Sequence, residues 1–363
     1  MVTLQTQIPQ LLFSSQFPDL AFATSDDSEA AVSLHAGNTE IFQATHIPYG
    51  RVINVHDLRS VIEYYMRQHN LTLEAFQLRV THIQTTAVAA SFKVVYLEQH
   101  FTGDTAEFLR NNFLTTMAGK LMSPKTTEYL HFFSEAFAQE VIKYRVVARV
   151  YDDEPRTFQR TVQPSVGTTD AIRTITVTHD VMVDAVTSNG WNAEAVTVLA
   201  CSVQVGARVF TYYVQDCEPN LTLYFRNAFN RFECCALNAV TTQKPKVERS
   251  IAVTNRVSSF YNQQNEKQYE VETAGLTMEQ ARWIEQLFYS HDVRMDIGET
   301  ANPQLMPIVL ITDTTCEVSD EDGELNSVKF TYQYQDRRTW LQTDYLSVDH
   351  ERVFTEEFDP SFQ

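Results

Sequence analysis

Alternation of apolar and polar residues is the feature that most constrains the fold of this 363-residue chain. Val328, Phe330, Tyr332 and Tyr334 are separated by polar residues at every intervening position. Successive side chains of a strand point to opposite faces, so this period of two indicates a strand with one buried face. Segments rich in β-branched and aromatic residues predict further strands at 92–97, 141–151, 172–178, 195–205, 208–214, 222–232 and 308–311.

The predicted strands follow one another at short spacing, with few helices between them. A parallel βαβ unit needs a long crossover, usually helical, so the spacing favours sandwiches or antiparallel meanders. We therefore expect a mainly β (α+β) fold with two or three β-sandwich or antiparallel-sheet domains and a few short helices. Glycine accounts for 10 of the 363 residues, below the usual ~7%. Tight turns with positive φ should accordingly be few.

Two helices are predicted from apolar residues spaced three and four apart. The first runs from His56 to Gln68 and the second from Thr277 to about Ser290. Thr277 and Gln280 have the spacing of a capping box, in which each side chain bonds the other residue's backbone N–H. Trp283 lies off the apolar stripe of the second helix and is either a flank of the core or an interface residue.

Two polar, turn-rich passages predict junctions between domains. They are residues 152–167 and residues 241–249, and the second contains Pro245 among charged neighbours. The predicted division is an N-terminal β-rich domain (1–155) that contains the first helix, a middle β-domain (156–248) and a C-terminal α+β module (249–363) that contains the second helix.

The charge of the chain disfavours nucleic acid as a partner. There are 46 acidic and 28 basic residues, which give a net charge of −18. A surface of this sign repels phosphate backbones. No run of 18 apolar residues is present, so no membrane insertion is expected. The first 23 residues lack the basic start and apolar run of a secretory signal, and we expect a soluble protein made in the cytoplasm.

The five cysteines show no repeated spacing, which argues against a disulfide framework. Cys234 and Cys235 are adjacent and would point to opposite faces of a strand, so they cannot easily share one tetrahedral metal site. We expect reduced cysteines that pack as small hydrophobic residues. No metal and no cofactor is expected.

The sequence contains no catalytic motif that would indicate an enzyme. The chain lacks G-x-G-x-x-G, the P-loop, H-E-x-x-H and G-x-S-x-G, and no two of its histidines are spaced i, i+4. Ordinary surface or core histidines are therefore expected. A carboxylate pair of a glycoside hydrolase is defined by tertiary distance, so the sequence neither identifies nor removes that alternative.

Aromatic residues concentrate between Tyr224 and Glu233, interleaved with arginines. Such a stretch can stack on bases or sugars, but packing within the core or between subunits is the favoured reading for Phe225, Phe229 and Phe232. A second set, Phe354, Phe358 and Phe362, recurs every four residues near the C-terminal end. This set either docks on a neighbouring subunit or closes the core of its own domain.

Four segments, in their order along the chain, resemble tail proteins encoded by phages and prophages of Bacteroides-type bacteria. They are residues 50–59 with Asp57-Leu58-Arg59; the F-x-N-x-F-x-x-x-E stretch within 223–233; the helix 276–292 followed by 307–313 and 328–334; and the phenylalanine-rich segment 353–362. Asn230 stands where the family often has glycine after the second phenylalanine.

The resemblance implies a structural subunit of a phage tail or baseplate, of the distal-tail or tail-hub kind, without catalytic residues. Such a subunit forms a homo-oligomeric ring, docks to other tail or baseplate proteins and ends up in the virion tail. The predicted interface residues are Phe225, Phe229, Phe232, Trp283, Phe354, Phe358 and Phe362. The alternative is a glycan- or receptor-binding module of a phage tail, and a glycoside hydrolase is less favoured than either.

Overall fold

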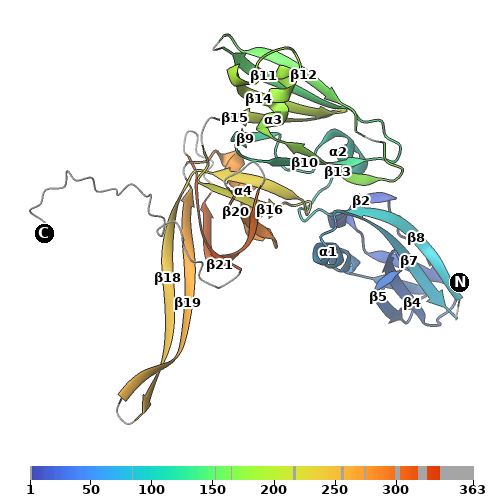
Figure 1. The fold of residues 1–363 in the computed structure, drawn as a ribbon. Helices are drawn as coiled ribbons and strands as arrows, with labels where there is room; N and C mark the ends of the chain where they lie inside the picture. Colours follow the sequence, from blue (N-terminus) through green and yellow to red (C-terminus); the bar gives the residue numbers. More distant parts are fainter. Residues whose placement is uncertain are drawn as a thin grey trace, which may run out of the picture.

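The structure is a computed structural model, and it describes residues 2–83, 85–151, 153–164, 166–215, 218–254, 257–273, 275–298, 303–317 and 325–335. The chain is mainly β, with several antiparallel sheets and few helices (Figure 1), which confirms the predicted fold class. Three groups of strands can be distinguished, and the chain passes through them in sequence order.

The N-terminal unit contains a three-stranded and a five-stranded sheet. The first has the order β1 (Val2–Leu4), β3 (Leu20–Thr24), β6 (Val52–Val55). The second has the order β2 (Leu11–Phe13), β8 (Thr85–Val95), β7 (Leu73–His82), β4 (Ala30–Ala36), β5 (Thr39–His46). Helix α1 (Leu58–Gln68) buries Leu58, Ile62 and Met66 in the same core as strand residues of both sheets.

The middle unit is built on a five-stranded sheet covered by one helix. Its strand order is β12 (Arg156–Val162), β11 (Ile142–Val150), β14 (Val196–Val205), β15 (Arg208–Val214), β9 (Gly119–Met122). Helix α3 (His179–Thr187) packs on β11, β12 and β14. A two-stranded sheet of β10 (Glu128–Ser134) and β13 (Ala171–Val177) lies between this unit and the rest, together with the short helix α2 (Thr105–Asn111).

The third unit is a seven-stranded sheet. Its order is β17 (Phe232–Leu237), β16 (Leu221–Arg226), β20 (Val293–Asp296), β21 (Leu305–Glu317), β22 (Ser327–Tyr334), β19 (Val257–Thr273), β18 (Ala239–Thr254). Helix α4 (Met278–Tyr289) begins with the predicted capping box of Thr277 and Gln280. Its buried face joins the core that this sheet shares with the middle unit.

Three local predictions are corrected by strand pairing. The segment 222–232, predicted as one strand, is divided between β16 and β17, which pair antiparallel around a turn at 227–231. Residue 155 lies between β11 and β12, which are neighbours in one sheet. Residue 248 lies inside β18. Neither predicted boundary therefore separates two sheets, because the polar residues there belong to a hairpin turn and an exposed strand.

The turn Asn227–Arg231, here the central turn, joins the N-terminal unit, the two-stranded sheet and the seven-stranded sheet. Asn227 Nδ2 donates to the carbonyl of Leu114 (2.8 Å), and the amide of Ala228 donates to Gln286 Oε1 of α4 (2.9 Å). Phe229 stacks on Phe108 of α2 with ring centroids 5.8 Å apart. The ring of Phe229 belongs to a small core that also contains residues of β2, β8 and β10. Buried backbone groups are thus paired across unit boundaries, as burial requires.

The backbone at Asn230 has a conformation that glycine adopts easily. Its φ is 59°, in the left-handed region that glycine occupies without cost and asparagine tolerates better than most residues. Its Nδ2 donates to the carbonyls of Leu71 (2.9 Å) and Met66 (3.3 Å), which follow or end α1. The side chain therefore ties the seven-stranded sheet to the N-terminal unit.

Two substitutions of Asn230 should distinguish the contribution of its side-chain hydrogen bonds from that of its left-handed backbone. Asn230→Gly keeps the left-handed backbone but removes the donor to the carbonyl of Leu71, while the carbonyl of Met66 still accepts from the amide of Leu71 (2.8 Å). This loss should cost about 1–3 kcal/mol of unfolding free energy. Asn230→Ala adds the left-handed penalty of a further ~1–2 kcal/mol. Urea denaturation of the two variants measures the difference. Equal stability of both would show that the backbone conformation at this position is not strained.

Candidate functional site

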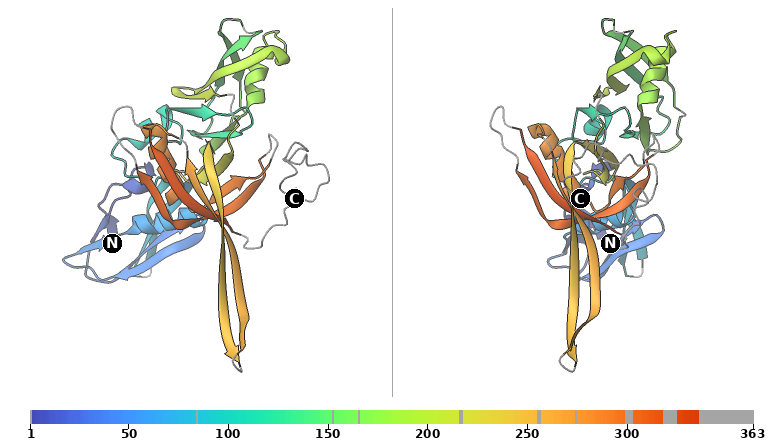
Figure 2. Two further views of the ribbon diagram at one scale, coloured as in Figure 1. Left: turned by 90° about the vertical axis from the view of Figure 1, so that its left-hand side faces the viewer. Right: turned by 60° about the vertical axis from the view of Figure 1, so that its left-hand side comes forward.

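Strands β18 and β19 form an arm that extends far beyond the sheet to which they belong (Figures 1 and 2). They contain 16 and 17 residues, while β22 pairs with β19 over Tyr269–Glu272 alone. Residues 244–254 and 257–268 consequently pair with each other and with no other strand in the described chain. We call these residues the arm. At ~3.3 Å per residue, the arm projects on the order of 35 Å.

The described side chains of β18 within the arm lie mostly at the surface. Every residue from Val240 to Arg249 is exposed. In its outer part, Val247, Ile251 and Val253 are 46%, 59% and 70% exposed. An isolated two-stranded hairpin is marginally stable in water. An arm of this length, with Val247, Ile251 and Val253 exposed, is therefore a candidate interaction element rather than a part of the folded core.

A free strand edge runs along the arm. β18 ends the order of the seven-stranded sheet, and no strand among the described residues pairs with its outer side. The outer side of β18 is thus a strand edge, and a strand edge is the usual template for adding a strand of another chain. The sequence contained a signal for this surface, because Val247, Ile251 and Val253 are all odd-numbered and share one face.

Four of the predicted interface residues, Phe225, Phe229, Phe232 and Trp283, lie outside the arm. Phe225, Phe229 and Trp283 are buried within the chain, at 0%, 2% and 7% exposure, so the structure assigns them to the core. Phe232 is half-buried between two guanidinium groups, with Arg226 4.4 Å and Arg294 4.8 Å from its ring centroid. The predicted interface residues Phe354, Phe358 and Phe362 lie outside the residues that the structure describes.

A buried charge cluster is the nearest feature to a catalytic site. Lys120 of β9 forms an ion pair with Glu128 (2.6 Å) and donates to the carbonyl of Cys234 (2.8 Å). Its ammonium lies 5.1 Å from the ring centroid of Trp283, whose Nε1 donates to Glu233 (2.8 Å). Burial opposes the charge on Lys120, but nearby Glu128, Glu233 and Cys234 outweigh it and raise the pKa of the lysine. Burial also raises the pKa of Glu128.

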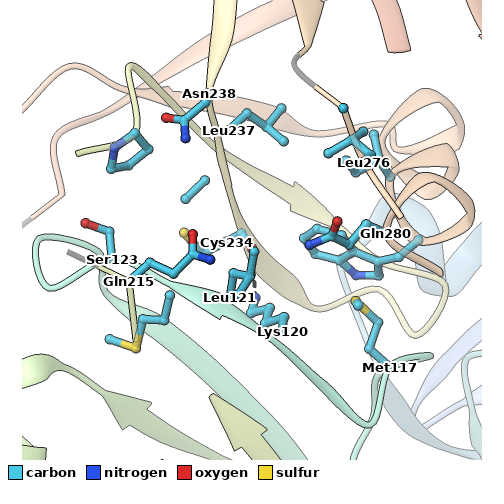
Figure 3. Close-up of a pocket in the computed structure, with 16 residues that line it drawn as sticks. Met117, Lys120, Leu121, Ser123, Gln215, Cys234, Leu237, Asn238, Leu276 and Gln280 are labelled. Carbon is cyan, nitrogen blue, oxygen red and sulfur yellow. Dashed lines mark hydrogen bonds between the residues drawn. The ribbon is translucent and has the colours of Figure 1, made fainter. Parts of the chain in front are cut away.

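A pocket of about 290 Å³ opens beside this cluster, between β9, β17 and α4. Figure 3 shows Lys120, Leu121, Leu237, Leu276 and Gln280 around it. The polar atoms of Lys120 are directed to partners within the protein, as described above. The neighbouring thiol of Cys234 is buried, and burial raises its pKa well above the usual range, so it does not supply a thiolate nucleophile.

His131 is buried, and both of its ring nitrogens have hydrogen-bond partners. His131 Nε2 donates to the carbonyl of Phe232 (2.9 Å), and its Nδ1 accepts from Thr174 Oγ1 (2.9 Å). Burial lowers the pKa of His131 to about 4, so the ring is neutral near pH 7. The thiols of Cys201, Cys234 and Cys235 are free and buried. Burial raises the pKa of Cys235 to about 12, consistent with cysteines that pack as hydrophobic residues.

The described residues contain neither a metal-binding cluster nor a membrane-spanning helix. No group of three or more His, Cys, Asp or Glu side chains is placed to hold a metal ion there. Over the same residues, the helices are too short or too polar to cross a lipid bilayer.

Comparisons with known proteins identify no relative. No family model matches the chain, and no curated protein matches it. Among solved structures, the crystal structure of CBD12 from CALX1.2 aligns with 56% of this chain and 79% of that chain, at 8% identity and a TM-score of 0.15. A score this low carries no argument about fold or function.

We expect the Lys120–Glu128 pair to be required for stability. Lys120→Met leaves an uncompensated buried carboxylate and should lower the unfolding free energy by ~3–5 kcal/mol at neutral pH. The double variant Lys120→Met/Glu128→Gln should recover a large part of that loss. The control is Lys125→Met, which removes an exposed pair with Glu218 and should cost ~0–1 kcal/mol. Equal losses from Lys120→Met and Lys125→Met in urea denaturation would contradict the assignment.

His131 should make stability depend on pH. The unfolded chain binds a proton below a pKa of ~6.5, whereas folded His131 does so near pH 4. The unfolded state therefore binds more protons between these values, and the unfolding free energy should fall by ~1.4 kcal/mol per pH unit as the pH is lowered through this window. His131→Gln should show a shallower fall in denaturant titrations at pH 7, 6 and 5. Parallel curves for variant and wild type would contradict the prediction.

Proposed function

We propose that the protein is a non-enzymatic structural subunit of a bacteriophage tail or baseplate, and that it acts by assembling with further copies and with neighbouring virion proteins. The observation that carries the proposal is the arm, a projecting hairpin with an open strand edge and with Val247, Ile251 and Val253 exposed. A strand edge of this kind is a liability for a protein that remains alone. The same edge is useful to a protein whose sheet is extended by a strand of a neighbouring subunit.

The rest of the chain supports the same proposal. Its conspicuous aromatic residues connect parts of the chain that are far apart in sequence: the ring of Phe229 lies 5.8 Å from Phe108 of α2 and 6.0 Å from Phe13 of β2. The body is thus a rigid support from which the arm projects. The resemblance of its four ordered segments to phage and prophage tail proteins supplies the biological setting, namely a ring or adaptor in the virion tail that is assembled in the bacterial cytoplasm.

A glycan-binding module remains the second candidate of the sequence reading. It requires several aromatic rings on one exposed platform. The exposed aromatic side chains belong to separate elements, such as Tyr64 on α1, Tyr213 on β15 and Tyr289 on α4. The geometry therefore favours assembly over sugar stacking.

Shortening the arm tests the proposal. Pro245 and Lys267 face each other in the ladder, so Lys246–Glu266 can be replaced by Asn-Gly, which closes a two-residue hairpin turn. We expect the body to keep its melting temperature, because the removed residues bury little surface, while assembly is lost. The measurement is the mass in solution by light scattering over a range of concentrations, together with electron microscopy of the full-length protein.

The matched control keeps the arm and alters an exposed side chain at its base, Val240→Thr. This variant should assemble as the wild type does, since Val240 lies before the arm. The proposal would be refuted by a full-length chain that stays monomeric alone and in the presence of candidate tail proteins. An arm-shortened variant that assembles like the wild type would refute the role of the arm.

A further inference from the structure

The free edge of β18 consists of two chemically different parts. Lys244, Pro245 and Lys246 lie in succession near the body. Proline has no N–H to offer to an added strand, and lysines on an edge oppose strand addition. These three residues therefore protect the inner part of the edge. Further out, Val247–Val253 contains neither lysine nor proline, and Val247, Ile251 and Val253 are exposed.

We propose that Val247–Val253 pairs antiparallel with the same segment of a second copy of this chain, about a twofold axis at Ser250. The inference rests on the proposed function and names its partner and register. It joins two arms edge to edge, in the strand order β19, β18, β18, β19. The result is a four-stranded sheet, and a sheet of three or more strands is more stable than an isolated hairpin.

The sequence of this segment is complementary to itself in the proposed register. Val247 faces Val253 of the partner subunit, and the symmetry repeats this apolar pair. Glu248 faces Ala252 of the partner subunit, and Arg249 faces Ile251 of the partner subunit. No like charges are opposed, whereas an axis at Glu248 or Arg249 would place equal charges against each other. An axis at Ser250 uses the whole unprotected segment and ends where Lys246 and Pro245 begin.

The backbone is compatible with this pairing. The ladder between β18 and β19 contains one irregularity, where Ser250 faces Asn262 but Ile251 faces Phe260. The extra residue is in β19, so the alternation of β18 continues through the segment. Val247, Arg249, Ile251 and Val253 therefore point to one face. An axis on a residue pairs odd positions with odd positions, as the alternating direction of backbone groups in an antiparallel ladder requires.

A pair of double variants with the same two positions changed tests the register. Val247→Lys/Val253→Lys places like charges opposite each other, and Val247→Lys/Val253→Glu places opposite charges there. Both remove the same two exposed valines, so both should fold like the wild type. We expect the like-charge variant to dimerise at least about tenfold more weakly than the opposite-charge variant in sedimentation equilibrium at low salt. Val240→Lys, before the arm on the same strand, should leave dimerisation unchanged.

Cross-linking gives an independent measurement. Ser250→Cys puts two thiols on the twofold axis and should form a disulfide-linked dimer under mild oxidation, whereas Glu248→Cys should not. The register is overturned if the two double variants dimerise equally, or if the two cysteine variants cross-link equally. The proposed function still stands in that case, provided that the wild type assembles. A wild-type chain that stays monomeric at all concentrations, and also fails to bind candidate tail proteins, overturns both.

Discussion

Burial of the central turn is the constraint on which the arrangement of the molecule depends. A tight turn placed in the interior must pair its polar groups with other parts of the chain, because water does not reach them. Asn227 and Asn230 do so by donating to carbonyls of residues more than 100 positions away, beside α1 and before β9. The N-terminal unit, the two-stranded sheet and the seven-stranded sheet are therefore held at fixed positions, and the arm projects from a body that cannot easily bend beneath it.

Local signals in the sequence predicted the elements whose structure is determined locally. The capping box of Thr277 and Gln280 forms because both partners lie within one helical turn. The alternation of Val328–Tyr334 corresponds to β22, which buries Val328, Phe330 and Tyr332 on one face. The fold class followed from the same patterns. The short helices α2 and α3 were missed, since they contain too few turns to show a clear period.

Tertiary context decided the elements that were predicted wrongly. In the aromatic stretch, strand-forming residues continue past Phe225, so nothing local marks the turn except Asn230, whose left-handed φ is stabilised by partners distant in sequence. The arm was read as a junction because Pro245 and charged neighbours usually mark loops. A strand exposed on both faces has no buried side to impose a strict period of two, so Arg249 interrupts the alternation of Val247, Ile251 and Val253.

The same reasoning connects the arm to assembly. Aromatic and β-branched residues fill the cores of this chain, whereas Val247, Ile251 and Val253 of the arm are exposed to solvent. A monomer gains nothing from Val247, Ile251 and Val253 in that position, and the open edge exposes it to unspecific strand pairing. The protected inner edge at Lys244–Lys246 limits where a strand can be added, while the outer edge remains available. An edge that is closed near the body and open near the tip limits strand addition to a contact of defined length at a distance from the folded core, as the proposed role in assembly requires.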